Sequence, residues 1–450
     1  MRTPKTPPPL NDAVGSVWTN VEILRRSREP AVKDLIHRAN NEGWNWEDCS
    51  YRSHLADLVP LQFWGLVKLA RQVDRQTTPI LDAAGRPFTY RLPPIAYQAL
   101  HTADTELAGV IGALSPQLAS EADQSRYLVR GLREEGIASA MYEGASTTRD
   151  VAREMIRSDR KPRTAGERMV WNNYHTIREL NRRRDEPLTP ERLCEVQRLL
   201  TDGTLKKPDA AGRFRRPDED IALVDDESGD RVFTPPPAAE LPERVRRLCE
   251  FANAPTDPER FVHPVIRAVL LHFWLAHDHP FYDGNGRTAR ALFYWSMLRQ
   301  GYWLTEYLTI STVIAGQPKQ YGRAYLDTEA DDNDLTYFIL YHLRVIERSI
   351  RDFTDYLSRK AAEQREMGRL LSGPFNDRQR ALLTRAIGDP AAVFTYESHA
   401  NSHGVQVSTA REDLLALESL ELMRKNKTGR RFEFRPAPGI RSRLQELTNG

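Results

Sequence analysis

The 450-residue chain has only three cysteines, Cys49, Cys194 and Cys249, and they lie far apart. An odd number at this spacing supports neither a disulfide framework nor a zinc site, and it favours a reducing compartment. Net charge is also scarce, because 64 basic residues are matched by 62 acidic ones. No overall field therefore directs the chain to nucleic acid or to a membrane, and any such attraction must be local.

Long hydrophobic runs are lacking as well. The longest apolar stretch, 268–276, is interrupted by His272 and is shorter than the roughly 18 residues that a membrane span needs. The first 15 residues are polar and proline-rich and contain no apolar segment, which argues against a secretory signal. These absences predict a cytoplasmic protein without a membrane partner.

The features that are present divide the chain into three regions. Residues 1–100 begin with a leader, 1–11, that we expect to be disordered, and continue with helical stretches and a turn at 84–87 that is typical of a hairpin. Residues 101–365 are mostly helical, and a smaller unit, 376–440, follows a break at Ser372-Gly373-Pro374. The first region also contains four tryptophans that we expect in the core: Trp18, Trp44, Trp46 and Trp64. Its function is not indicated.

Two helices are predicted in the middle of the chain. Apolar residues recur with helical spacing over 258–276, and a second segment, 286–300, is apolar nearly all round, which predicts a central buried helix. Upstream, two short β-type segments flank a polar turn within 212–233, before the proline run 235–237. This pattern indicates a β-hairpin.

The two central helices are joined by the sequence His279-Pro280-Phe281-Tyr282-Asp283-Gly284-Asn285-Gly286-Arg287-Thr288-Ala289-Arg290. A Gly-Asn-Gly turn that opens a helix presents several N–H groups to one point, and the helix dipole strengthens the attraction for an anion. Arg287 and Arg290 share one face of the first turn and can bind phosphate bidentately. Basic residues in a first turn are unfavourable for an isolated helix, so they indicate a bound anion.

Two further side chains complete this predicted site. Asp283 is a carboxylate beside the expected phosphates, which is how proteins usually hold Mg²⁺. His279 has a side chain that titrates near neutrality. A lone His-Pro pair or a lone Gly-x-Gly would indicate only a helix end and a turn, but the combination predicts a phosphate cradle, a metal ligand and a base.

The segment 279–290 resembles the signature of the Fic family, His-Pro-Phe-x-Asp/Glu-Gly-Asn-Gly-Arg-x-x-Arg, and matches it at every fixed position. The flanking sequences, the predicted hairpin and 321–336 also agree, so the resemblance covers about 101–360. It implies a mainly α fold with a helical Fic core that carries a β-hairpin flap. It also implies a protein adenylyltransferase, which moves AMP from ATP to a hydroxyl side chain of another protein.

The resemblance further implies a role for each residue. His279 would be the general base, Asp283 would hold Mg²⁺ on the α- and β-phosphates, and Phe281 would be a buried anchor that aims His279. The hairpin at 212–233 would be a flap that pairs with a target protein carrying the Ser, Thr or Tyr hydroxyl. The residues implied to bind the nucleotide, with Arg290 at the γ-phosphate and Tyr321 near the adenine, are Gly284, Asn285, Gly286, Arg287, Arg290 and Tyr321.

An upstream segment, Ser139-Ala140-Met141-Tyr142-Glu143-Gly144, resembles the inhibitory motif of the family, Ser/Thr-x-x-x-Glu-Gly/Asn. Ser139 and Glu143 would share one face of a helix near 137–144, and Gly144 suits the position that ends it. The resemblance implies that Glu143 pairs with Arg290, takes it from the γ-phosphate and autoinhibits the enzyme. The alternative is an ordinary exposed glutamate.

The last unit, 376–440, resembles a winged helix-turn-helix. Helices are predicted at 376–387, 391–402 and 409–423, and Thr409 with Glu412 predicts a capping box at the start of the third. The basic segment 424–431 would be the wing. DNA binding through 405–435 is one interpretation. A homodimer contact or target docking is the other, because Glu412 and Asp413 would repel phosphate if they faced outward.

Three functions thus stay open on the sequence. The first is AMP transfer, autoinhibited by Glu143, and the intact signature favours it. The second is a DNA-binding regulator that uses the Fic site as a nucleotide sensor. The third is a Fic enzyme with another donor, or one that removes AMP. The target protein, the modified residue type and the oligomeric state are not indicated.

Overall fold

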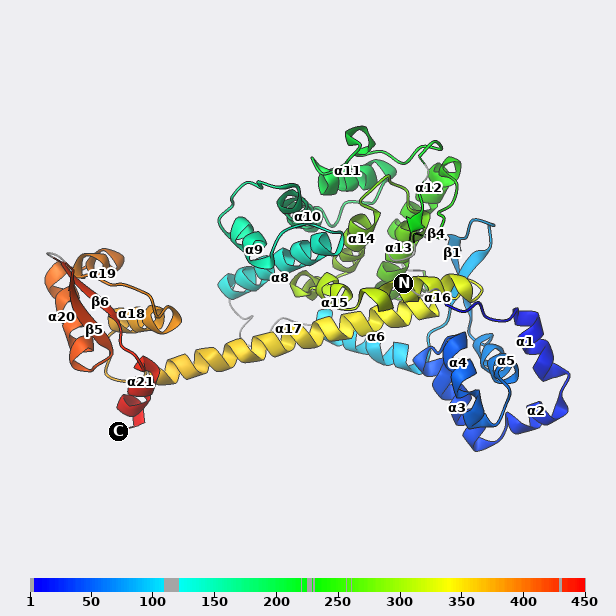
Figure 1. Cartoon of the computed structure of the whole chain (residues 1–450), viewed down its shortest axis with the longest axis horizontal. Helices are drawn as coiled ribbons and strands as arrows, with labels where there is room; N and C mark the ends of the chain where they lie inside the picture. Colours follow the sequence, from blue (N-terminus) through cyan, green and yellow to red (C-terminus); the bar gives the residue numbers. More distant parts are fainter. Residues whose placement is uncertain are drawn as a thin grey trace. The chain divides into compact units, whose positions relative to one another are not determined.

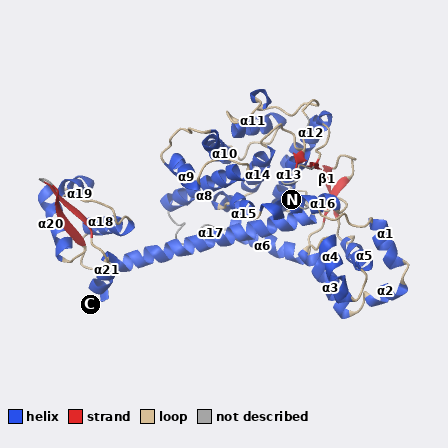
Figure 2. Ribbon diagram, viewed as in Figure 1, coloured by secondary structure: helices blue, strands red, loops and turns tan. Residues whose placement is uncertain are grey.

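The computed structural model describes every residue except 1–3, 109–120, 220, 225–228, 230, 256, 260, 429–430 and 450. The described residues are mainly helical, with three two-stranded antiparallel sheets, so the predicted fold class is confirmed (Figure 2). The chain divides into two compact units, Met1–Phe353 and Thr354–Gly450, and the boundary falls within the long helix α17 (Thr336–Leu370). None of the described helices is long and apolar enough to span a membrane.

The first hundred residues form helices followed by a hairpin. The strands β1 (Gln76–Leu81) and β2 (Pro87–Tyr90) confirm the hairpin predicted around the turn at 84–87. The helices are α1 (Leu10–Trp18), α2 (Val21–Arg26), α3 (Pro30–Glu42), α4 (Trp46–Arg52) and α5 (Pro60–Arg71). The leader is shorter than predicted, because helix α1 begins at Leu10 and Pro4 is already buried.

The tryptophan prediction is wrong at one position. Trp44 and Trp64 are buried, but the side chain of Trp18 is 62% exposed. Trp18 is the last residue of α1, and that helix buries Ala13 and Val17 instead. The largest apolar side chain of this nine-residue helix therefore lies outside the protein core.

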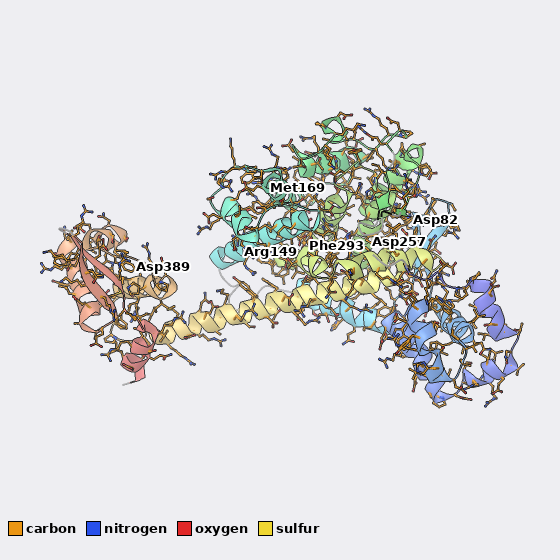
Figure 3. The ribbon with its side chains drawn as sticks, viewed as in Figure 1. Asp82, Arg149, Met169, Asp257, Phe293 and Asp389 are labelled. Carbon is orange, nitrogen blue, oxygen red and sulfur yellow. The ribbon has the colours of Figure 1, made fainter. Side chains whose placement is uncertain are left out.

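The rest of the first unit is a helical core around α14. Every residue of α14 (Asn285–Arg299) from Arg287 to Leu298 is buried, as the apolar pattern predicted, and Phe293 is labelled within this packing in Figure 3. The surrounding helices are α6 (Pro94–Leu107), α8 (Glu121–Tyr142), α9 (Arg149–Arg157), α10 (Ala165–Arg182), α11 (Pro190–Thr201), α12 (Leu241–Asn253), α13 (Pro264–Asp278), α15 (Ile310–Gly316) and α16 (Pro318–Ala330) (Figure 1).

In this core, one helix starts later than predicted, and the predicted hairpin is shorter than the segment 212–233. Helix α13 begins at Pro264 rather than near 258, because His263 caps it by accepting a hydrogen bond from the Val265 N–H and Pro264 occupies the first turn. The predicted flap hairpin is present as β3 (Leu223–Val224) and β4 (Arg231–Phe233), which pair antiparallel. Most of its turn lies outside the described residues.

The second unit contains α18 (Asp377–Gly388), α19 (Tyr396–His403), α20 (Val407–Ser419), β5 (Met423–Thr428), β6 (Arg431–Pro436) and α21 (Ile440–Asn449). The second and third helices do not begin where they were predicted. Phe394 pairs with Phe434 of β6 in a single β-bridge, so α19 starts only after Thr395. Helix α20 starts at Val407, so Thr409 lies inside its first turn and the predicted capping box is wrong.

Candidate functional site

The loop between α13 and α14 is built by backbone conformations that few residues adopt. His279 has a φ of 47° and ends α13, and Gly284 has a φ of 86° and precedes α14. The side chain of Asn285 closes the loop, because its Oδ1 accepts from the Phe281 N–H (2.9 Å) and its Nδ2 donates to the Phe281 carbonyl (2.8 Å). Phe281 is fully buried, as an anchor of the loop should be.

His279 is held in one tautomer. Its Nδ1 donates to the carbonyl of Ala276 at 3.1 Å, which leaves Nε2 as an acceptor when the ring is neutral. Burial lowers the pKa of His279 below its ordinary value, and the nearby charge of Arg215 adds to that shift. The imidazole is therefore neutral near pH 7 and able to accept a proton.

Two residues that the sequence did not single out hold this loop. Arg215, which is buried, donates its Nε to the His279 carbonyl (2.8 Å), and its backbone N–H donates to the Pro280 carbonyl (2.8 Å). Gln197 of α11 is fully buried and donates to the Asp283 carbonyl (2.9 Å). Because their partners are backbone groups, neither contact leaves a pattern in the sequence.

Asp283, in the loop just before α14, forms an ion pair with Arg287 in the first turn of that helix. Arg287 NH2 lies 3.2 Å from Asp283 Oδ1, and Arg287 NH1 donates to the Leu200 carbonyl at 3.2 Å. The guanidinium is buried, whereas half of the Asp283 side-chain surface is exposed. The pair thus presents a carboxylate to solvent beside a buried cation.

Arg290 is held by Glu143, its predicted partner, and by Ser139 of α8. Its Nε donates to Ser139 Oγ (3.0 Å), and its NH2 donates to Glu143 Oε1 (2.9 Å) and to the Ser139 carbonyl (3.2 Å). Gly144, at a φ of 87°, follows Glu143 at the end of α8, as predicted. Within the described part of the chain, the buried NH1 of Arg290 has no hydrogen-bond partner.

The Glu143 carboxylate lies against the first turn of α14. A Cβ atom at Gly286 would collide with Glu143 Oε1, so only glycine allows this approach. The N–H groups and the dipole of a helix N-terminus favour a negative charge at such a position. Glu143 therefore occupies a place that an anionic ligand would also seek.

Tyr321 of α16 belongs to a buried aromatic cluster next to Arg290. Its hydroxyl bonds to His272 Nε2 (2.8 Å) and to the Tyr325 hydroxyl (3.1 Å). Its ring lies 5.8 Å from that of Tyr142, over which the Arg290 guanidinium sits at 5.3 Å. The structure thus brings Tyr321 to the edge of the site, and its contact with adenine stays a prediction.

Comparisons with known proteins agree with this geometry. Residues 187–297, which include the loop, all of α13 and most of α14, match the model of a family described as Fic/DOC family. A Fic family protein from Desulfovibrio desulfuricans G20 has a solved structure with 21% identity and a TM-score of 0.51, covering 75% of this chain and 96% of that chain. The helical unit therefore has the Fic fold.

Relatives with an assigned name match over shorter segments. "Protein adenylyltransferase Fic" of Nematostella vectensis is 29% identical over 167 residues, which are 37% of this chain and 34% of the relative. The protein of the same name in Drosophila melanogaster is 40% identical over 68 residues, which are 15% of this chain and 13% of the relative. The chain thus matches about a third or less of the length of these relatives.

Proposed function

We propose that this chain transfers AMP from ATP to a hydroxyl side chain of another protein. The observation that carries the proposal is Arg290, a buried guanidinium at the N-terminus of α14 whose NH1 has no partner among the described residues. A buried, partly unpartnered cation at a helix N-terminus is suited to a phosphate group. The adenylyltransferase names of the partial relatives support the same reaction.

The arrangement of the loop supports the following reaction. Nε2 of His279 takes the proton from the target hydroxyl while that oxygen forms a bond to the α-phosphorus of ATP. The bond from the α-phosphorus to the oxygen that bridges to the β-phosphate breaks, and pyrophosphate leaves with the electron pair. The backbone of 284–286 and Arg287 would cradle the phosphates, and positioning with electrostatic stabilisation supplies the rest of the rate enhancement.

Asp283 fits a magnesium ion. Its half-exposed carboxylate lies beside the helix N-terminus that would hold the phosphates. No cluster of three or more metal-ligating side chains occurs in the described parts of the chain, so the other ligands would be phosphate and water oxygens, which Mg²⁺ commonly takes. The ion would neutralise charge on the departing pyrophosphate.

Glu143 would act as an internal brake on this reaction. Its carboxylate holds Arg290 NH2 and lies against Gly286, so a γ-phosphate and Glu143 would compete for one place. While Glu143 holds Arg290, ATP lacks the contact that sets the α-phosphate in line with the attacking oxygen. The side chain is 26% exposed, so a modest movement of the end of α8 would release it.

Label transfer tests the proposed reaction. Purified wild-type protein and Glu143→Gly are incubated with a cell lysate and ATP labelled either at the α- or at the γ-phosphate. Relative to the lysate without added protein, extra label should reach protein from the α position alone, and more of it with Glu143→Gly. Label from the γ position would indicate a phosphotransferase, label from another nucleotide alone would change the donor, and loss of AMP from modified protein alone would indicate the reverse reaction.

We also propose that 377–436 is a winged helix-turn-helix that binds DNA, and the burial of Asp413 favours this function. The Asp413 carboxylate accepts from Arg378 (2.7 Å) and Asn376 (2.7 Å) inside the unit, so it cannot repel phosphate as a surface group would. The two acidic residues Glu412 and Asp413 lie in the middle of α20, and of these only Glu412 is exposed. Helices α19 and α20 are separated by a three-residue turn that starts with Gly404 at a φ of 63°, as is typical of helix-turn-helix motifs.

The β5–β6 hairpin supplies the positive charge that DNA binding needs. Residues 424–435 include six basic residues and one acidic residue, although the whole chain is nearly balanced. The ladder places Arg424 directly opposite Arg435, and both are exposed. Like charges opposite each other destabilise a hairpin, so their pairing favours a surface that binds an anionic polymer.

Binding of the full-length protein to a short labelled DNA duplex of mixed sequence, measured by fluorescence anisotropy across a salt titration, tests this second function. Affinity should fall steeply as salt rises. An absence of binding at the lowest salt would exclude the DNA interpretation and leave docking or a homodimer contact, which sedimentation would then distinguish.

A further inference from the structure

The hairpin β1–β2, far upstream in the sequence, lies beside the end of the helix that carries His279 (Figure 1). Its fully buried Phe88 packs against the ring of Phe273 (5.0 Å between centroids) and against that of His277 (5.0 Å), both on the last turns of α13. Phe233 of the flap strand β4 meets His277 at 5.3 Å. The residue two positions before His279 therefore contacts both hairpins.

A buried ion pair strengthens this connection. Asp278, immediately before His279, has a side chain that is only 2% exposed. Its Oδ1 lies 3.1 Å from Arg244 NH1 of α12, and its Oδ2 accepts from Trp274 Nε1 at 2.9 Å. A buried carboxylate is tolerated only with such partners, so its position is strongly determined.

Arg244 extends this ion pair to the hairpin. Its NH1 donates to the Leu81 carbonyl and its NH2 to the Asp82 carbonyl, each at 2.8 Å. Asp82, labelled in Figure 3, in turn closes the hairpin turn by accepting from the Arg86 N–H (2.8 Å), and it is held by Asn333 (3.0 Å). One guanidinium thus joins the turn of the upstream hairpin to the residue before His279.

This connection matters because His279 has a backbone conformation that costs energy. At a φ of 47°, a residue other than glycine is strained and persists only when its surroundings determine it. Arg215 holds the carbonyl side of this turn. On the other side, Arg244 holds Asp278, the residue immediately before His279, through the buried ion pair.

We infer that the hairpin at 76–90 is a positioning element of the active site, which acts on His279 through Arg244 and Asp278. Residues 1–100, whose function the sequence did not indicate, thereby gain a role in the catalytic unit. Arg244 and Asp278 are positioning residues, because neither is shown to touch the reacting groups. The catalytic consequence rests on the proposed function, but the structural role of the hairpin does not.

Hydrogen exchange of the full-length protein tests this inference without relying on activity. Arg244→Gln should speed amide exchange in peptides that cover 275–285, because the turn at His279 loses its support. Arg246→Gln is the matched control: it lies on the same helix, removes the same charge and, among the described residues, bonds to Glu243 and Glu250 of that helix. It should leave exchange in 275–285 unchanged.

Because Arg244→Gln leaves Asp278 buried without its ion-pair partner, the double variant Arg244→Gln/Asp278→Asn is measured as well. It removes both charges and should still loosen the loop, while Arg244→Lys should restore the wild-type exchange only in part, since one ammonium cannot reach the carboxylate and two carbonyls. Unchanged exchange at 275–285 in the folded single and double variants would overturn the inference, as would equal loosening by Arg246→Gln.

Kinetics add a readout that a merely structural role would not produce. If the loop is misaligned, kcat for AMP transfer should fall by about 10- to 100-fold in Arg244→Gln, while KM for ATP stays within about twofold. A fall in kcat that is fully accounted for by loss of folded protein would contradict positioning, because fewer active molecules lower the apparent kcat and leave KM unchanged. If the wild-type chain transfers no nucleotide, the proposed function fails, and the exchange experiment still decides the role of the hairpin.

Discussion

The arginines of α14 and the arginines of the β5–β6 hairpin are both suited to phosphate, but they differ in burial. Arg287 and Arg290 are at most 2% exposed, and each is paired with a carboxylate of the same chain. Arg424 and Arg435 are exposed and face each other. A buried cation needs an internal partner because desolvation is costly, whereas an exposed cation is stabilised by water.

This difference has a functional consequence. A ligand that binds Arg287 and Arg290 must displace or share the carboxylates that pair with them in its absence, so its binding should depend on those partners. A ligand of the β5–β6 hairpin displaces water, counterions and, at Arg435, a partly exposed ion pair with Glu433, so its binding should depend mainly on salt. The predictions below test this contrast, from the largest expected effect to the smallest.

His279→Ala should have the largest effect and should be confined to the buried site. Transfer of AMP should fall by about 10²- to 10⁴-fold, because only proton abstraction is lost. Nucleotide binding, measured by calorimetry, and DNA affinity should stay close to wild type. Self-modification that is undiminished in His279→Ala would refute the proposed role of the base.

Asp283→Ala should abolish magnesium-dependent turnover, with a loss of about 10²-fold, because the ion neutralises charge on the pyrophosphate. Asp283→Asn is the matched variant, since its Oδ1 can still accept from the Gly284 N–H that Asp283 holds now. Both variants should fail across a Mg²⁺ titration of the transfer rate. Normal turnover by either would show that the metal is held elsewhere.

Glu143→Gly should raise AMP transfer by about tenfold or more, because a charged hydrogen bond no longer holds Arg290. Most substitutions lower activity, so the sign of this effect is informative. The gain should disappear in combination with His279→Ala and shrink strongly with Arg290→Ala. If folded Glu143→Gly is no more active than wild type at any ATP concentration, Glu143 is not a brake.

The triple variant Arg424→Gln/Arg431→Gln/Arg435→Gln should weaken DNA binding and reduce the slope of log affinity against log salt by about one for each lost phosphate contact. The charge-matched control, Arg359→Gln/Arg365→Gln/Arg369→Gln on exposed positions of α17, should leave the slope unchanged. AMP transfer should be the same in both. Equal slopes for the two triple variants would assign binding to net charge rather than to the hairpin.

The smallest effect concerns pH. His279 must be neutral to accept a proton, and burial lowers its pKa below the ordinary value of 6.5. As pH falls, the transfer rate should therefore decline with a midpoint below 6.5, which a profile of kcat/KM from about pH 5 to about pH 8 would show. A loss of activity with a midpoint at or above the ordinary histidine pKa would indicate that His279 is not desolvated. The α14 site would then differ less in burial from the β5–β6 hairpin.

Local sequence was sufficient for much of this molecule. The apolar pattern of 286–300 predicted the buried central helix, since burial on all sides requires apolar residues all round. The turn at 84–87 and the β-type segments within 212–233 predicted two hairpins, because glycine and proline have strong conformational preferences. The signature 279–290 placed a histidine, a carboxylate and two arginines around the start of one helix, and their proximity follows from their short separation along the chain.

Only the tertiary structure decided what supports that loop. Arg215, Gln197 and Arg244 bind backbone carbonyls, and any residue type supplies a carbonyl, so no sequence pattern marks these contacts. The pairing of Glu143 with Arg290 spans 147 residues and depends on the packing of α8 against α14. Helix starts at Pro264 and Val407, the exposure of Trp18 and the inward position of Asp413 were also decided by long-range packing, which overrides weak local preferences.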